Sequence, residues 1–234
     1  MTLSEPLPPA DVLAQLLRER RSVRAFQPRP VERALIERLL AEAALAPSGA
    51  NLQPWRVHVL RGAALQQVVQ RAQAIHHDPE QAAQLQAEYR YYPAEWKPEY
   101  AARRRKIGLD LYELLGIAKG DKARMHEQHG RNYAFFGAPV GLLFSIDRSL
   151  TQGSWLDCGM FMQNLMLAAR AHGLDTCVQA AWIHFHAQLA EWLDLPPEEM
   201  LLCGMALGYA DPAAPENRLT TERAAVAEFA RFHE

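Results

Sequence analysis

Three arginines and a serine lie within five residues near the start of the chain. They form the segment Arg20-Arg21-Ser22-Val23-Arg24, which follows a stretch with helical periodicity. Guanidinium groups match phosphate oxygens in geometry, and a phosphate monoester carries a charge of about −1.5 to −2 for them to neutralise. The segment therefore suggests a phosphate site, although by itself it also fits a solvated basic turn.

A second polar segment reads APSGANLQPW from Ala46 to Trp55. The side chains of Ser48, Asn51 and Gln53, together with backbone amides, could line a planar heterocycle that has many donors and acceptors. The alternative is an ordinary connection between a helix and a strand.

The elements that must position these segments follow from hydrophobic periodicity. We expect helices at 11–20, 31–46, 154–172 and near 187–193, strands at 55–60, 140–146, 176–180 and 200–209, and a mostly helical segment at about 63–131. Strands that alternate with helices indicate an α/β or α+β sandwich in which helices cover a central sheet.

Composition excludes several classes of function. The 25 basic and 27 acidic residues give a net charge of −2, so we expect neither nucleic acid nor a membrane as a partner. No run reaches the roughly 18 apolar residues of a membrane span, and Met1 to Pro9 lacks the features of a signal peptide. We therefore expect a cytoplasmic protein.

The spacing of the cysteines and histidines gives little support for a metal site or for redox-active thiols. Cys158, Cys177 and Cys203 are widely spaced in apolar surroundings, which is typical of buried free thiols in a reducing compartment. The pairs His126/His129 and His184/His186 would need further ligands to hold a metal ion. We expect no metal site.

The helix expected from Ser154 to His172 is apolar on nearly every side, so most of its surface must be covered. A partner subunit is a natural cover in a chain of this size. Its polar residues Asp157 and Asn164 share one stripe, which favours an internal hydrogen-bond network over a direct cofactor contact.

The order and spacing of these motifs resemble the nitroreductase family. The family signature RRSxRxF, then PV, then APSxxNxQPW corresponds here to Arg20–Phe26, Pro30-Val31 and Ala46–Trp55. The resemblance continues through Gln163–Leu174 and Leu207–Tyr209 to Thr221-Glu222-Arg223, and the closest branch looks like the nitrobenzoate reductases.

The resemblance implies an α+β fold, a nitroreductase-like three-layer sandwich with a central mixed sheet flanked by helices. It implies one FMN-binding domain over residues 1–234 with a helical insertion at about 63–131, and a homodimer with two FMN sites at its interface. The implied reaction is ping-pong hydride transfer from NADH or NADPH to a nitroaromatic, quinone-like or related electron-poor acceptor. Reductive dehalogenation, flavin destruction, enone reduction and non-catalytic flavin binding stay open as alternatives.

The same resemblance implies roles for individual residues. Arg20, Arg21, Ser22 and Arg24 match the motif at the FMN phosphate and pyrimidine side, and Arg223 matches a residue that reaches the phosphate. Ser48 and Asn51 match the loop over the ring, with Gln53 as a neighbour, and Gln179, Ala180 and Ala181 lie where a backbone N–H faces flavin N5. No side chain is expected to be catalytic, because the flavin carries the chemistry; Arg24 is the candidate for tuning the ring by its charge.

Two features leave alternatives open. Thr221 stands where many family members have Lys, so the phosphate would depend more on Arg20, Arg21 and Arg218. The aromatic residues from Tyr89 to Trp96 could form a wall of the substrate pocket or pack the insertion onto the core, and the run from Arg103 to Lys106 could attract an anionic ligand or be a solvated helix face.

Overall fold

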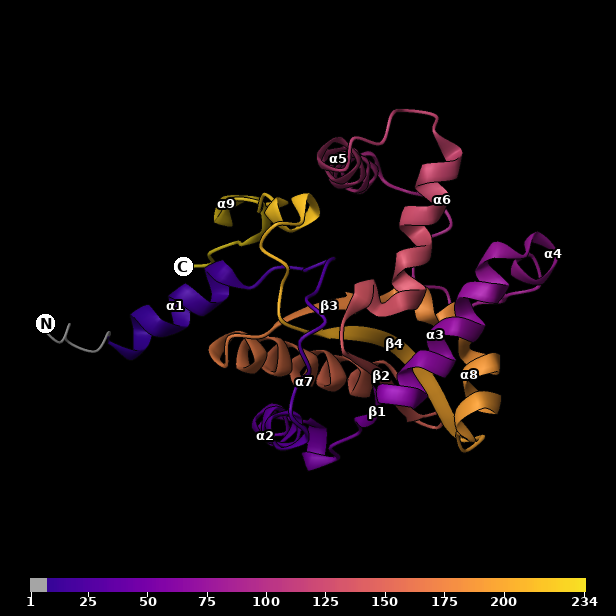
Figure 1. Cartoon of the computed structure of the whole chain (residues 1–234). Coiled ribbons are helices and arrows are strands. Elements are labelled where there is room, and N and C mark those ends of the chain that lie inside the picture. Colours follow the sequence, from indigo (N-terminus) through magenta and orange to yellow (C-terminus); the bar gives the residue numbers. More distant parts are fainter. Residues whose placement is uncertain (1–7) are drawn as a thin grey trace, which may run out of the picture.

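A four-stranded sheet forms the centre of the computed structural model, which describes residues 8–234 (Figure 1). The strands are β1 (Arg56–Arg61), β2 (Val140–Asp147), β3 (Asp175–Gln179) and β4 (Glu199–Gly208). They lie in the order β1-β2-β4-β3, and every neighbouring pair is antiparallel. The expectation about Met1 to Pro9 falls largely outside the described residues.

The sequence analysis predicted a mixed sheet, and within residues 8–234 the parallel pairing is limited to one bridge. Ser22 forms a parallel bridge with Thr176 of β3, and Phe26 forms an antiparallel bridge with Ala210. The strands themselves correspond closely to the four expected from the sequence.

Both faces of the sheet are covered, which explains the uninterrupted apolar run of β2. Leu142, Phe144 and Ile146 belong to one core cluster, whereas Leu143 belongs to the other. Successive side chains of a strand point to opposite faces, so the protein has the three-layer arrangement that was predicted.

The first core layer consists of α2 (Arg33–Ala43) and α7 (Gln152–Ala171), which pack side by side on the sheet (Figure 1). The sequence predicts a longer second helix, but α2 ends at Ala43. Pro47 has no N–H to donate to the Ala43 carbonyl, which instead accepts from the backbone of Ala46 (3.0 Å) and from Asn164 Nδ2 (3.5 Å).

The opposite layer combines α3 (Gly62–His77) with η2 (Arg131–Gly137), η3 (Ala180–Phe185) and α8 (His186–Leu193). Trp182 of η3 is fully buried and stacks on Phe135 with 4.6 Å between ring centroids. It lies directly against Gly204 of β4, where a Cβ atom would come within 2.3 Å of Trp182 Cδ1. A side chain at position 204 would therefore displace the indole.

The helical segment near 63–131 has two parts. Its first helix, α3, buries Leu65, Val68 and Ala72 in the core, and the short α4 (Pro79–Ala82) follows it. The helices α5 (Pro98–Leu114) and α6 (Lys122–Gly130) instead rise away from the sheet (Figure 1). The second part is the one that stands outside the layers.

The remaining elements are α1 (Pro9–Glu19), η1 (Gly49–Asn51), η4 (Pro215–Arg218) and α9 (Val226–Phe229). Of these, η1 packs against α7. Figure 1 shows α1 and α9 near each other, on the side of the molecule where α5 overhangs the sheet. None of the helices within residues 8–234 has the length and hydropathy of a membrane span.

The cysteine prediction is confirmed. Cys158, Cys177 and Cys203 are free and buried. Burial raises the pKa of Cys158 and Cys203 to about 12, so these thiols stay protonated at neutral pH.

Candidate active site

The segment from Ser22 to Gln27 is extended and runs from β3 to the residues that follow β4. The Val23 N–H donates to the Thr176 carbonyl (3.0 Å), and the Gln27 N–H donates to the Tyr209 carbonyl (2.8 Å). Alternate side chains of an extended segment face opposite ways. Val23 and Ala25 are accordingly buried, whereas Ser22 and Arg24 face outward into a cavity.

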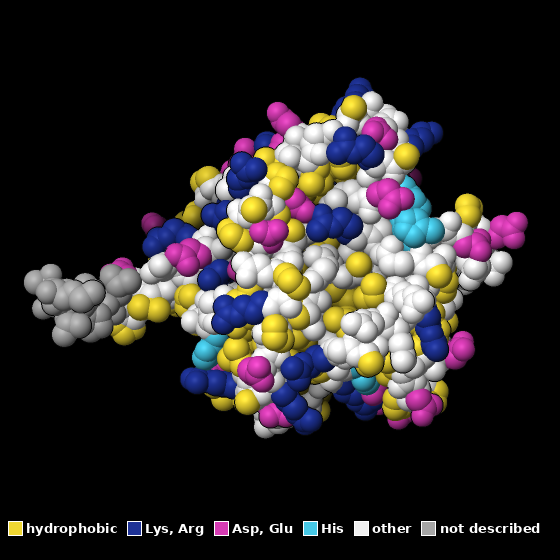
Figure 2. Space-filling view, viewed as in Figure 1, with side chains coloured by type: hydrophobic (Ala, Val, Ile, Leu, Met, Phe, Trp, Pro, Cys, Tyr) yellow, Lys and Arg dark blue, Asp and Glu magenta, His cyan; other side chains and the backbone are white. Residues whose placement is uncertain are grey.

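This cavity of about 570 Å³ gathers the predicted phosphate ligands. It is lined by Leu17, Arg18, Arg20, Arg21, Ser22, Arg24, Ile107, Leu219, Thr220, Thr221 and Arg223. Five of these residues are arginines, three carry hydroxyl groups, and no carboxylate is among the lining residues that the structure describes. In Figure 2, Lys and Arg side chains are interspersed with Asp and Glu across the face that is drawn.

The arginines of the cavity are free to bind an anion. Within residues 8–234, no ion pair involves Arg20, Arg21, Arg24 or Arg223, although many other arginines of the chain are paired. Their charges reach the buried Cys177 behind the segment, where burial raises the thiol pKa to about 11 while Arg24 and Arg20 oppose the rise. Guanidinium groups without carboxylate partners are suited to a phosphate.

Asn217 fastens the arginine segment to the C-terminal part of the chain. Its Oδ1 accepts from the backbone N–H of Arg24 (2.8 Å), and its Nδ2 donates to the carbonyls of Ala25 (2.8 Å) and Asp211 (2.9 Å). The neighbouring Glu216 is buried and paired with Arg131. Asn217 is a positioning residue that the sequence analysis missed, because an isolated Asn in a polar stretch carries no signal of its distant partners.

The end of β3 presents the next group of predicted site residues. Gln179 lies three residues beyond Thr176, which pairs with Ser22, so about 10 Å of strand separates them. Its Nε2 donates to the Asn132 carbonyl (2.7 Å), but its buried Oε1 has no partner within the described chain. Ala180 and Ala181 follow at the start of η3 and are partly exposed.

The arginine cavity fits a ligand that carries a phosphate, as FMN does, because none of its described lining residues is a carboxylate that would neutralise the guanidinium groups. Gln179 is 2% exposed and does not line this cavity.

The loop with Ser48, Asn51 and Gln53 lies elsewhere in the chain. It is held internally, because Ser48 Oγ accepts from the Gln53 N–H (3.0 Å), and Asp157 of α7 accepts from the Gly49 N–H (3.2 Å). Asn51 and Gln53 are exposed and have φ values of 58° and 50°. The internal network predicted for Asp157 and Asn164 is thus present, through Gly49 and Ala43.

The distance between this loop and the arginine cavity follows from α7. The loop contacts Asp157, whereas Arg170, 13 residues further along α7, pairs with Asp175 beside the cavity (2.7 Å). At 1.5 Å per residue the two regions are about 20 Å apart. One chain therefore does not bring Ser48, Asn51 and Gln53 to the cavity.

Comparison with known proteins agrees with this geometry. Residues 17–209 match the model of the nitroreductase family. The chain belongs to the nitroreductase family. It is 42% identical over 213 residues to a 4-nitrobenzoate reductase of Pseudomonas putida (91% of this chain, 92% of that protein). It is 37% identical to a nitrobenzene nitroreductase of Ectopseudomonas oleovorans (97% and 99% covered).

The fold of this nitroreductase-family protein is also similar to that of a solved relative. The crystal structure of the FMN and NADPH-dependent nitroreductase NfnB from a Sphingopyxis strain has 39% identity and a TM-score of 0.88, with 97% of this chain and 100% of that one covered. The family resemblance inferred from motifs is confirmed.

Within this nitroreductase-family cavity, the structure adds residues that the motifs did not indicate. Arg18, Thr220 and Ile107 line it, whereas Arg218 is exposed in η4 and does not. Arg18 lies in the last turn of α1, two residues before the arginine segment, and this closeness in sequence was the available signal. Ile107 comes from α5 and had no such signal.

A serine, a histidine and a glutamate also meet on the sheet, but they do not form a catalytic triad. Nε2 of His58 contacts Glu199 (2.7 Å) and also lies 3.4 Å from Ser145 Oγ, whereas a triad histidine uses different nitrogens for its two partners. Ser145 is only 1% exposed and hydrogen-bonds Glu199 itself. The group is a structural network.

The histidines near α6 do not form a metal site among the described residues. His76 stacks on His126 with 3.9 Å between ring centroids, and burial lowers the pKa of His76 and of the adjacent His129. In residues 8–234, no group of histidine, cysteine or acidic side chains has the arrangement of a metal site.

Proposed function

We propose that the protein is an FMN-dependent oxidoreductase that uses NADPH or NADH to reduce nitroaromatic, quinone-like or related electron-poor acceptors. The observation that carries the proposal is the cavity with five arginines and, among its described lining residues, no carboxylate; it includes the residues that match the family's phosphate motif. The named activities of the relatives support the choice of acceptor.

The side chains divide the work of holding the cofactor. Arg20, Arg21 and Arg223 would neutralise the phosphate, with Ser22 donating a hydrogen bond, and Arg24 would place positive charge beside the pyrimidine part of the ring. A backbone N–H within Gln179–Ala181 would face flavin N5. The chemistry supplied by bound FMN is hydride acceptance from the reductant and electron delivery to the acceptor. The side chains of the protein would bind and orient FMN and tune its potential, and the reaction requires no protein nucleophile.

We also propose that the active protein is a homodimer. On α7, Phe161 and Leu165 are buried in the core, but Leu156 and Met160 are 72% and 39% exposed. The two exposed residues are four apart and so share one stripe of the helix. Exposed apolar surface of this kind marks an interface.

Exposed apolar residues of α1 and of the C-terminal segment extend this interface. On α1, Val12, Leu13 and Leu17 are exposed, and the C-terminal segment exposes Val226, Phe229 and Phe232. Together these residues fit the large hydrophobic interface of an obligate dimer.

A second copy would complete the cofactor site. A two-fold axis across α7 pairs one end of the helix with the opposite end of the partner's helix. The loop of Ser48, Asn51 and Gln53 in one subunit would then approach the arginine cavity of the other, which accounts for their separation of about 20 Å along α7 in a single chain.

The cofactor and acceptor are tested together on purified protein. After reconstitution, we expect tightly bound FMN in preference to FAD, anaerobic bleaching of the flavin by NADPH or NADH, and recovery of its colour on addition of 4-nitrobenzoate, nitrobenzene or a quinone. Failure to retain FMN contradicts the proposal. Retention of FMN without bleaching by either reductant leaves a flavin-binding protein and contradicts the enzymatic part.

The dimer is tested with the double variant Leu156→Asp/Met160→Asp. Two charges in an apolar interface should produce monomers in sedimentation velocity and weaken FMN binding, with the circular dichroism of the fold retained. A folded monomer that binds FMN as tightly as the unaltered protein contradicts a site shared between subunits.

A further inference from the structure

The basic run of α5 is divided between two sides of the helix. Arg103 pairs with Glu228 (3.8 Å), and Lys106 pairs with Asp110 (2.7 Å) and Glu222 (3.5 Å), so this side faces the C-terminal segment. Arg104 and Arg105 line a separate cavity of about 820 Å³. The run is therefore neither a uniform solvated face nor a single anion site.

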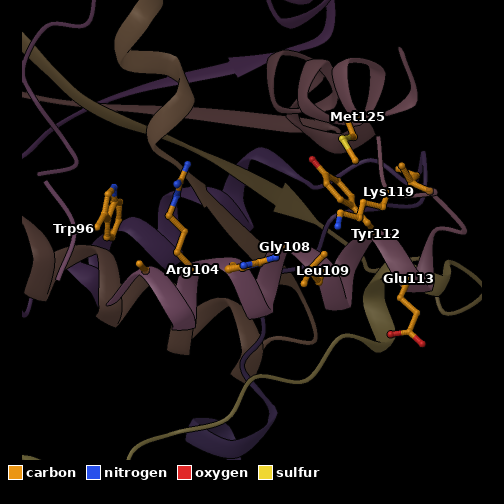
Figure 3. A pocket seen from close by; sticks show the side chains of 11 residues that line it. Trp96, Arg104, Gly108, Leu109, Tyr112, Glu113, Lys119 and Met125 are labelled. Atoms are coloured by element: carbon orange, nitrogen blue, oxygen red, sulfur yellow. The ribbon is translucent and has the colours of Figure 1, made fainter. Parts of the chain in front are cut away.

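This second cavity lies between α5 and the chain that leads into α6 (Figure 3). Its lining residues on α5 repeat with helical periodicity, and Trp96 precedes them. The lining comprises Trp96, Ala101, Arg104, Arg105, Gly108, Leu109, Tyr112, Glu113, Ile117, Lys119 and Met125. Its size lies in the range of small-molecule sites, and it combines apolar and aromatic walls with a few charges.

The positive charges of the cavity are not neutralised by the protein. In the described part of the chain, Arg104, Arg105 and Lys119 take part in no ion pair, in contrast to Arg103 and Lys106. Glu113 lines the same cavity, but its carboxylate points away from Arg104 and Tyr112 in Figure 3. The cavity is thus electropositive and open to an anionic ligand.

Aromatic contacts hold one of these charges in place. The guanidinium of Arg104 lies 5.2 Å from the ring centre of Trp96 and 5.7 Å from that of Tyr92. Figure 3 shows Trp96 and Arg104 at one end of the cavity, with Lys119 beside Tyr112 at the other. Eight residues of α5 separate Arg104 from Tyr112, so the two ends are about 12 Å apart.

The cavity is also close to the arginine cavity assigned to FMN. Ile107 lines the FMN cavity and the next residue, Gly108, lines the second one. The helix α5 is therefore their common wall, and about one helix diameter of 10–12 Å separates them. A ligand of two linked nucleotides can extend from one cavity to the other.

We infer that the cavity between α5 and α6 binds the adenosine half of the nicotinamide reductant, and that Arg104 and Arg105 select NADPH over NADH by binding its 2′-phosphate. The inference rests on the proposed function. Trp96 offers a flat surface for the adenine at the end that holds Arg104, and Lys119, at the other end, is placed to bind the pyrophosphate.

The spread of charge favours a nucleotide over an aromatic acid as the occupant. A benzoate carries a single negative charge that one arginine satisfies, whereas Arg104, Arg105 and Lys119, at two ends of this cavity, have no ion-pair partner among residues 8–234. A 2′-phosphate with about −1.5 to −2 charge and a pyrophosphate fit that distribution. A substrate carboxylate is the competing outcome of the test.

The first experiment measures binding without turnover. Calorimetry on the FMN-loaded protein compares adenosine 2′,5′-bisphosphate with 5′-AMP. We expect the bisphosphate to bind at least ten-fold more tightly, the variant Arg104→Met/Arg105→Met to lose that advantage, and Arg103→Met, which removes a charge from the other side of α5, to retain it. Equal binding of the two nucleotides to the unaltered protein overturns the inference.

The second experiment compares kcat/KM for NADPH and NADH, and for 4-nitrobenzoate and nitrobenzene. In the double variant, we expect a fall of ten-fold or more with NADPH, a change below three-fold with NADH, and an unchanged preference between the two acceptors. A loss that follows the acceptor's carboxylate instead assigns the cavity to the acceptor and overturns the inference. Because nucleotide binding is measured independently, failure of nitro reduction would be recognised separately.

Discussion

Replacement of Asn217 by alanine should loosen the arginine segment from Arg20 to Arg24. The side chain makes three hydrogen bonds, to the N–H of Arg24 and to the carbonyls of Ala25 and Asp211. At about 1 kcal/mol for each hydrogen bond, they contribute about 3 kcal/mol together. Because Asn217 is half-buried, water replaces part of the loss, and we expect the free energy of unfolding to fall by about 2 kcal/mol.

The same substitution should weaken FMN binding, since the released segment carries Ser22 and Arg24. If FMN binding must spend about 1.4 kcal/mol on ordering the loosened segment, the Kd for FMN rises about ten-fold. Denaturant unfolding of the apoprotein and quenching of FMN fluorescence measure the two quantities. Turnover at saturating FMN should stay within about two-fold, because Asn217 touches the segment and not the reacting ring.

Two further variants make the reasoning specific. Asn217→Asp retains the acceptor for Arg24 but sets a carboxylate against two carbonyls, so it should be at least as damaging as alanine. Gln27→Ala removes one hydrogen bond, to the Ala210 carbonyl (3.0 Å), at the far end of the segment and should leave the FMN Kd unchanged. An Asn217→Ala protein that loses the expected stability but keeps its FMN Kd would refute the positioning role.

Other predictions concern the cofactor and the sheet. Arg223→Ala should weaken FMN binding by about 1.5 kcal/mol, which is the low end for a charged hydrogen bond because the residue is exposed, and added FMN should restore activity. Arg24→Gln should lower the flavin midpoint potential and slow flavin reduction, and saturating FMN should not restore the rate. Burial opposes ionisation of Glu199, but hydrogen bonds from Ser145 and His58 and the charge of Arg56 lower its pKa below the usual 4.5. Its ionised form thus stabilises the fold above about pH 4.5, and the stability difference between the unaltered protein and Glu199→Gln in acid titration should shrink as pH falls through the lowered value. Gly204→Ala should cost about 1–3 kcal/mol in denaturant unfolding by crowding Trp182, and an unchanged midpoint would show that the indole can move freely.

The sequence alone determined the layers and the basic character of the arginine cavity. The apolar run at 140–146 and the helical periodicity at 154–172 correspond to β2 and α7, because strand and helix periods are local properties of the chain. The cluster from Arg20 to Arg24 was recognisable for the same reason, since its members lie within five residues. Among the arginines that line the cavity in the described chain, Arg223 came from far along the sequence, and the family motif supplied it.

Tertiary structure decided which side of each element faces which neighbour. Helical periodicity cannot separate Arg104 and Arg105 from Arg103 and Lys106 by function, because the partners of each pair are set by where α6 and the C-terminal segment pack. The loop of Ser48 to Gln53 lies about 20 Å from the arginines along α7, a separation that depends on the path of the chain through three layers. Long-range contacts such as Asn217 with Arg24, 193 residues apart, arise from that path and leave no local trace in the sequence.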